Sequence, residues 1–303
     1  MESVLVKSFS FIFIILLGFS LKSLGFFKRE DGAFISKIVV NITLPALLIS
    51  NASNMSLDLM SLSIILFAFI SNIIIVIIAK VINRDKESMV QAIAVINTTG
   101  FNIGNFAIPF VSSFFNATAI LYLCVFDIGN ALVSLGGSYA YASSLIEEQK
   151  VNPFKMVIKR LFTSIPFMVY LLIFILSLLK ITLPELVIST SAMVGQANVF
   201  LAMLMMGIML EIKINKEDIN ATIKILFSRY LIVTILSLIV YFVLPFPLLA
   251  KKTIVLALFS PISSVATVFS LKLGSKSSVP AIVNSISLLI SIAIMTLLLI
   301  VLI

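Results

Sequence analysis

NTTGFNIGNFAIP, residues 97–109, decides the fold, because it places three Asn, two Thr, two Gly and one Pro inside an otherwise apolar run. Pro109 lacks a backbone donor and clashes with the preceding turn, and the glycines weaken the helix. We therefore expect the helix that contains this stretch to break or kink between Asn102 and Pro109. Its polar face must lie against protein or water, because lipid leaves such groups unpaired.

A second stretch, SPISSVAT at residues 260–267, repeats this pattern later in the chain. Ser260 is the expected N-cap and Pro261 the expected first residue of a new half-helix. Two broken helices that meet would direct backbone N–H groups and positive helix ends at one point, which suits an anion. Packing kinks would explain either stretch alone, but a matching place in both halves of the chain favours a transport site.

The composition indicates an integral membrane protein. Of 303 residues, 61% are hydrophobic and 11% are charged, whereas soluble domains carry roughly 25% charged residues. The chain has one cysteine, Cys124, and no histidine, so the commonest general base and metal ligand is missing. We expect no metal, no cofactor and no enzyme activity. The apolar runs are continuous rather than alternating, which predicts an all-α fold.

Ten apolar runs are long enough to cross a hydrocarbon core of about 30 Å as helices. They cover approximately residues 5–25, 33–52, 59–80, 89–114, 118–143, 157–179, 185–211, 222–244, 250–272 and 280–302. The loops on one side hold 17 Lys and Arg, and those on the other side hold four. The positive-inside rule then places both termini outside a cytoplasmic membrane, and it explains the net charge of +8 without a nucleic-acid partner.

The most polar connection, IEEQKVNPFKMVIK at residues 146–159, falls near the middle of the chain. It divides the ten helices into five and five, which predicts one repeat over 1–146, a short cytoplasmic linker over 147–156 and a second repeat over 157–303. Because five is odd, two similar halves would enter the membrane in opposite senses, as in many secondary transporters. Pro109 and Pro261, 152 residues apart, are the expected equivalent positions.

FNIGNFAIPF, residues 101–110, resembles the Asn-x-Gly-x-x-Gly-x-Pro pattern in the fourth helix of the auxin efflux carrier family. Asn102, Gly104 and Pro109 match, and Ala107 stands where the family prefers Gly. Four further stretches resemble the family in the same order: NITLPALLIS (41–50), FLAMLMMGIMLEI (200–212), SPISSVATVFSLKLG (260–274) and NSISLLIS (284–291). The seventh helix departs from the pattern, since a Pro that many members carry is replaced near Val199. The short midchain loop makes a bacterial malate-type permease the closer likeness.

The resemblance implies a scaffold of the first, second, sixth and seventh helices and a transport domain of the remaining six. It also implies that the fourth and ninth helices cross at the site, that organic anions are the substrates, and that the scaffold forms a homodimer. The expected substrate-binding residues are Asn102, Gly104, Asn105, Pro109, Ser260, Pro261, Ser263 and Ser264.

Asp127, in LCVFDIGNAL, is the acid placed well inside a predicted span. A charge at that depth costs about 3 kcal/mol on insertion scales, so it should face the protein interior or a wet cavity. There it could bind and release a proton as access alternates. Asn130, three residues further on, lies on the same helical face as a hydrogen-bond partner. A structural role at a helix end is the alternative.

No Lys or Arg is expected centrally in a span, so backbone N–H groups at the breaks should hold an anion, with Asn102, Asn105 and hydroxyl groups adding hydrogen bonds. Free C=O groups at the same breaks would instead suit a sodium ion. Asn41, Asn72, Asn198 and Asn284 are expected to join helices rather than bind a ligand.

These features predict a permease, a secondary transporter of small mono- or dicarboxylates that works by alternating access. A proton or sodium symport or the membrane potential would drive it, because no G-x-x-x-x-G-K-[ST] sequence is present to bind ATP. The alternatives are an inverted-repeat cation/proton exchanger or bile-acid-type sodium symporter, and a non-transporting membrane scaffold or sensor.

Overall fold

The computed structural model describes residues 2–51, 59–146, 158–159, 162–211 and 216–302. Within these ranges the secondary structure is helical, apart from connections and one isolated antiparallel bridge between Phe101 and Ile262. The all-α prediction is therefore confirmed for the described part of the chain. The predicted linker over 147–156 lies outside it.

Seven helical stretches of the described chain are long and apolar enough to cross a membrane. They are Leu5–Ser23, Arg29–Ser50, Leu59–Ile82, Ala117–Ile146, Glu185–Met209, Ile219–Val243 and Val279–Leu302. The fourth and ninth predicted helices are each divided in two. The fourth predicted helix consists of α5 (Ser88–Thr98) and of a second part, in which η3 (Ile103–Ala107) runs into α6 (Ile108–Ser112). The ninth predicted helix consists of α13 (Leu248–Leu258) and α14 (Val265–Lys272). The sixth is the shorter helix α10 (Ile165–Leu178).

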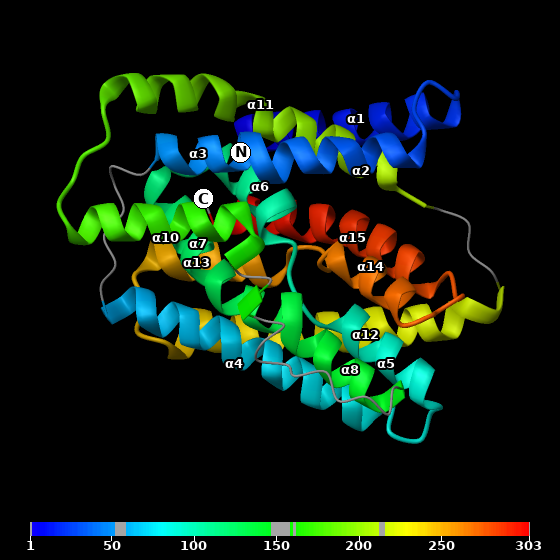
Figure 1. The fold of residues 1–303 in the computed structure, drawn as a ribbon. Helices are drawn as coiled ribbons and strands as arrows, with labels where there is room; N and C mark the ends of the chain where they lie inside the picture. The colour runs from blue at the N-terminus through cyan, green and yellow to red at the C-terminus, as the bar shows by residue number, and fades with distance from the viewer. Residues whose placement is uncertain (1, 52–58, 147–157, 160–161, 212–215, 303) are drawn as a thin grey trace.

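The helices fall into two groups (Figure 1). In the first, α11 (Glu185–Met209) packs against α1 (Glu2–Ser23), α2 (Arg29–Ile38) and α3 (Leu44–Ser50), and α10 packs against α3. The π-helical turn η1 (Val39–Thr43) joins α2 to α3. We call this set, α1 to α3 with α10 and α11, the first helix group.

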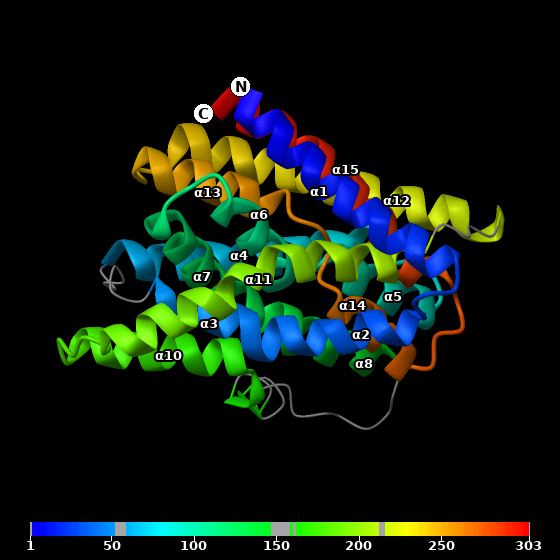
Figure 2. The ribbon, with the colours of Figure 1, turned by 90° about the horizontal axis from the view of Figure 1, so that it is seen from above.

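The second helix group contains both divided helices. Its other members are α4 (Leu59–Ile82), α7 (Ala117–Leu132), α8 (Ser138–Ile146), α12 (Ile219–Leu238) and α15 (Val279–Leu302). The π-helical turn η4 (Val133–Gly137) follows α7, and η6 (Ile239–Val243) follows α12. Helix α4 packs on α7 and α5, and α12 packs on α5 and α15. Helix α15 also contacts α1 of the first group, and the two run side by side in Figure 2.

Close approach of α1 and α11 depends on glycine. A Cβ atom at Gly207 would lie 2.0 Å from the backbone oxygen of Ile15, and one at Gly18 would lie 2.4 Å from that of Leu204. Helices come this close in membrane proteins where small residues meet. The contact fixes the two longest helices of the first group against each other.

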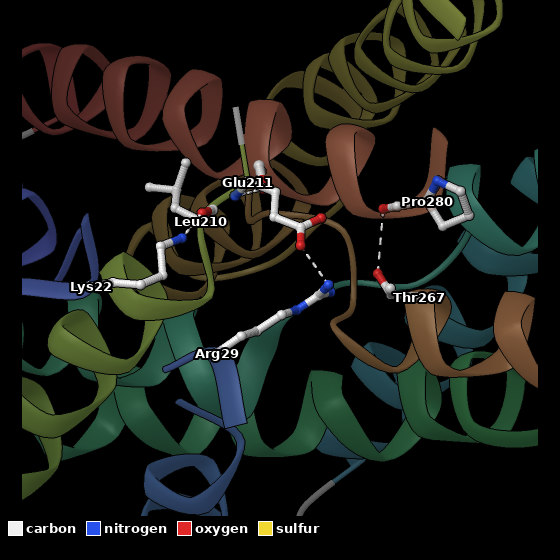
Figure 3. Close-up of polar contacts among 7 residues, drawn as sticks. Lys22, Arg29, Leu210, Glu211, Thr267 and Pro280 are labelled. Carbon is white, nitrogen blue, oxygen red and sulfur yellow. Dashed lines mark hydrogen bonds and ion pairs between the residues drawn. The ribbon is translucent and has the colours of Figure 1, made fainter. Parts of the chain in front are cut away.

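Polar contacts hold the end of α11 (Figure 3). Lys22 donates to the carbonyl of Leu210, and Arg29 forms a 2.5 Å ion pair with Glu211. Cations suit the negative end of a helix. The backbone N–H of Glu211 donates to Ser285 Oγ of α15 at 2.9 Å, so this end of α11 also contacts the second group.

Candidate functional site: the crossing of two broken helices

The first break lies between α5 and η3, at residues 99–102. The interval predicted for a break or kink, Asn102 to Pro109, therefore meets this break only at Asn102, and the rest of it contains the π-helical turn η3. Gly100 explains the difference, because its φ of +82° is a conformation that L side chains rarely adopt. Pro109 lies directly after the π-helical turn η3, at the second residue of α6.

The second break lies between α13 and α14, at residues 259–264. Ser260 and Pro261 lie within the break, so the prediction that they cap and start a half-helix is wrong. Ser264 takes the N-cap position and α14 begins at Val265. Pro109, which lies beyond its break, and Pro261 do not occupy equivalent places.

The two breaks cross and are joined through their backbones. The N–H of Asn102 donates to the carbonyl of Pro261 at 2.8 Å, and Phe101 pairs with Ile262 in the antiparallel bridge. Tertiary pairing thus keeps the chain extended around Pro261, which is why no helix starts there.

Side chains from α4 and α7 satisfy the first break. Asn130 accepts from the N–H of Phe101 and donates to the carbonyl of Phe101, both at 3.0 Å. Asn72 accepts from the N–H of Gly100 at 3.0 Å and donates to Asn130 Oδ1 at 3.4 Å. Asn72 and Asn130 are 0% and 2% exposed, so these bonds replace the helical ladder inside the protein.

Side chains from α15 satisfy the second break in the same way. The N–H of Ile262 donates to Ser287 Oγ at 3.2 Å, and Asn284 Nδ2 donates to the carbonyl of Ile262 at 3.3 Å. The residues that pair in the bridge, Phe101 and Ile262, are therefore each held at both N–H and C=O by the long helix that follows in the chain. Asn72, Asn198 and Asn284 all bond to another helical segment or break.

A cavity of about 150 Å³ lies beside the crossing. Both outgoing half-helices begin on its wall, through residues 102–105 and 263–265. The first N–H groups of a helix have no partner inside the helix and carry its positive end. Asn105 Oδ1 is buried and has no hydrogen-bond partner among the described residues, which leaves an unpaired acceptor in a residue that lines the cavity.

Seven of the ten predicted site residues line this cavity: Asn102, Gly104, Asn105, Asp127, Asn130, Ser263 and Ser264. Asn130 donates to Asp127 Oδ1 at 2.9 Å, which confirms the predicted contact. Pro109 and Ser260 are buried away from the cavity. Pro261 lines a second cavity of about 30 Å³, which Asn102 and Ser264 share with Met205 and Met209 of α11.

Arg229 is the residue that the sequence prediction missed. It lies in α12, is 0% exposed, and is the largest fully buried side chain in the described chain. Nη1 donates to the carbonyl of Thr98 at 2.7 Å and Nη2 to the carbonyl of Ser260 at 3.2 Å. The guanidinium carbon lies 4.8 Å from the ring centre of Phe101. The expectation that no cation sits inside a span is therefore wrong.

The error has an identifiable cause. The 17 basic residues assigned to the loops of one side include Arg229 and Lys224, although Arg229 falls inside the apolar run predicted over 222–244. Within the ranges the structure describes, the ion pairs are Arg29 with Glu211 and Arg84 with Asp85, so Arg229 has no carboxylate partner there. Its charge faces carbonyl groups and an aromatic ring instead.

The negative and the positive helix ends at the crossing therefore face different groups. Helices α5 and α13 end there, and their negative ends face the Arg229 guanidinium through Thr98 and Ser260. The positive ends of the Ile103–Ser112 segment and α14 face the cavity. Two positive helix ends at one cavity favour an anion, and Asp127 on the same wall is the acidic group that opposes them.

Interrupted helices that cross beside a cavity are a feature of membrane transporters. The sequence model of the membrane transport protein family matches residues 3–301. The chain belongs to this family of membrane transporters, which includes the auxin efflux carriers. A search among curated proteins finds no match.

Proposed function

We propose that this transporter carries small organic anions, mono- or dicarboxylates, across a cytoplasmic membrane by alternating access. The cavity at the start of both outgoing half-helices is the observation that carries the proposal. Backbone N–H groups near Gly104 and Ser264 would bind the carboxylate, with Asn102, Asn105 and Ser263 adding hydrogen bonds. The fixed positive charge of Arg229, behind Phe101, supports an anion over a cation.

The proposed architecture is an inverted repeat of ten spans, with halves over 1–146 and 157–303 and both termini outside. The hydrogen bonds that hold the backbones of Phe101 and Ile262 support it, because each set comes from the long helix after the break, α7 in the first half and α15 in the second. The first helix group would be the scaffold and the second the transport domain. Exposed Phe9, Phe13 and Leu172 on the first group offer an apolar surface for lipid or for a homodimer.

Asp127 would couple transport to a proton. Its carboxyl group lies on the cavity wall and is joined through Asn130 to the backbone of Phe101. With Asp127 protonated, Arg229 is the ionised side chain that remains at the crossing, and its positive charge favours an anion. When the proton and the anion have both been released, the negative charge of Asp127 balances the positive charge of Arg229. The empty site can then move back to face the other side of the membrane.

Uptake of labelled malate into proteoliposomes tests the proposal, under proton and sodium gradients imposed separately. Wild type is compared with Asn102→Ala, Asp127→Asn and the exposed control Ser189→Ala, each first shown to be folded. We expect uptake with wild type and the control, loss with Asn102→Ala, and uptake without proton dependence with Asp127→Asn. If neither malate nor a panel of competing carboxylates is transported, the organic-anion assignment is wrong.

A further inference from the structure

The carbonyl groups of the two breaks are the groups that a coupling cation would need. Broken membrane helices coordinate sodium ions with unwound backbone carbonyls and the C-terminal ends of half-helices. In this chain, donors of the protein itself occupy six carbonyls at or beside the breaks: that of Thr98 at the end of α5, and those of Phe101, Asn102, Ser260, Pro261 and Ile262 within the breaks. Two of the six, one at each break, are occupied by the same guanidinium.

Arg229 joins the two interrupted helices. Its guanidinium binds Thr98 at the end of α5 and Ser260 in the second break, and Ser260 lies 31 residues after Arg229 in the chain. A planar guanidinium presents several donors in fixed directions, so it can bind two carbonyls at once and keep its charge at any physiological pH. A sodium ion placed between the same carbonyls would supply the same charge, but it could leave.

The surroundings of Arg229 are those of a fixed cation. Its side chain is 0% exposed, and the Phe101 ring covers one side of the guanidinium at 4.8 Å. A cation over an aromatic face is stabilised most where water is excluded. No carboxylate of the described chain pairs with it, so its charge is offset by the negative ends of α5 and α13.

We propose that Arg229 is a built-in cation that replaces a coupling sodium ion at the crossing, and that this carrier therefore does not bind or use sodium. The consequence for transport rests on the proposed function. The consequence for ion binding, that the protein does not bind sodium, is independent of the proposed function because it concerns the folded protein alone.

Thermal unfolding of the purified protein tests the ion-binding part. Cys124 is the one cysteine of the chain and is 2% exposed, so a thiol-reactive fluorescent dye reports unfolding directly. Wild type, Arg229→Ala, Arg229→Lys and the surface control Arg84→Ala are unfolded at constant ionic strength. Sodium, N-methylglucamine or methylguanidinium is titrated as the chloride. The Arg84 side chain is 73% exposed, which makes it a matched control.

We expect sodium to leave the midpoints of wild type, Arg229→Lys and Arg84→Ala unchanged relative to N-methylglucamine. Arg229→Ala should unfold at a lower temperature, and methylguanidinium should raise its midpoint by about 3 °C or more by binding the vacated carbonyls. Methylguanidinium should not raise the midpoints of wild type and Arg84→Ala.

Stabilisation of the wild type by sodium overturns the proposal, whatever the variants do. A folded Arg229→Ala that ignores methylguanidinium overturns it as well. If Arg229→Ala does not fold, a sodium-stabilised Arg229→Lys is the contradicting result, and a sodium-insensitive one supports the proposal. Absence of carboxylate uptake together with selective rescue would refute the proposed function and leave the ion-binding inference standing.

Discussion

The N–H of Asn102 lies 2.8 Å from the carbonyl of Pro261, and this hydrogen bond joins two helix breaks that are far apart in the chain. Beside it, Phe101 and Ile262 form the one β-bridge of the described residues. Each break therefore satisfies part of the backbone of the other. The site at the crossing belongs to both halves of the chain equally.

Replacing Asn130 should destabilise the protein. Asn130→Ala removes both hydrogen bonds to Phe101 and leaves a buried N–H and C=O without their partner, at a cost of about 2 kcal/mol. That corresponds to a midpoint lower by about 4 °C or more, measured through the exposure of Cys124. Asn220→Ala, at an exposed position early in α12, should leave the midpoint unchanged. An unchanged midpoint for Asn130→Ala would show that the hydrogen bonds between Asn130 and Phe101 do not stabilise the break.

Adding a methyl group at Gly207 should separate α1 from α11. In Gly207→Ala the Cβ atom would lie 2.0 Å from the backbone oxygen of Ile15, so the helices must move apart. We expect loss of at least about 2 kcal/mol of stability, or failure to fold, because neither backbone can yield easily. Gly137→Ala is the matched control, since its nearest neighbour would be at an ordinary 3.5 Å. Equal yields and midpoints for the two variants would contradict this.

Removing the ion pair at the end of α11 should have a small effect. The side chains of Arg29 and Glu211 are 46% and 35% exposed, and such pairs contribute up to about 1 kcal/mol. Arg29→Ala should lower the midpoint by no more than about 3 °C, with a smaller difference from wild type at high salt. A larger loss that persists at high salt would mean that Arg29 contributes by packing rather than by charge.

The proposed orientation predicts opposite accessibility for two loops. In a Cys124→Ala background, the variant Ile181→Cys should react with a membrane-impermeant maleimide in intact cells. A cysteine at Lys86 should react only after the membrane is opened. Both positions are exposed in the folded protein, so a difference reports the side of the membrane. The reverse pattern would place the termini inside.

The sequence was sufficient to predict the helical elements. Apolar length and the Asn, Gly and Pro content of residues 97–109 identify helix and interruption, because both depend on local composition. The position of the first break was not predictable in this way. It depends on Asn72 and Asn130, which lie on other helices and hold the backbone at Gly100 and Phe101.

The burial of Arg229 at the site could not be predicted from the sequence either. An arginine ten residues into α12, after several lysines in sequence, has the pattern of a membrane-surface residue. Its burial follows from the carbonyls of Thr98 and Ser260, which only the folded chain brings to it. Asp127 could be predicted because its own span is apolar on both sides and its partner Asn130 is one turn away.

The crossing also sets an order for biogenesis. When the ribosome has made the first break, the N–H of Asn102 has no partner, because Pro261 is not yet synthesised. At about 5–20 residues per second, the 159 residues from Ile103 to Pro261 take roughly ten to thirty seconds. During that interval the nascent first half must keep an open backbone out of lipid. The insertion machinery therefore has to shelter it until the second half arrives.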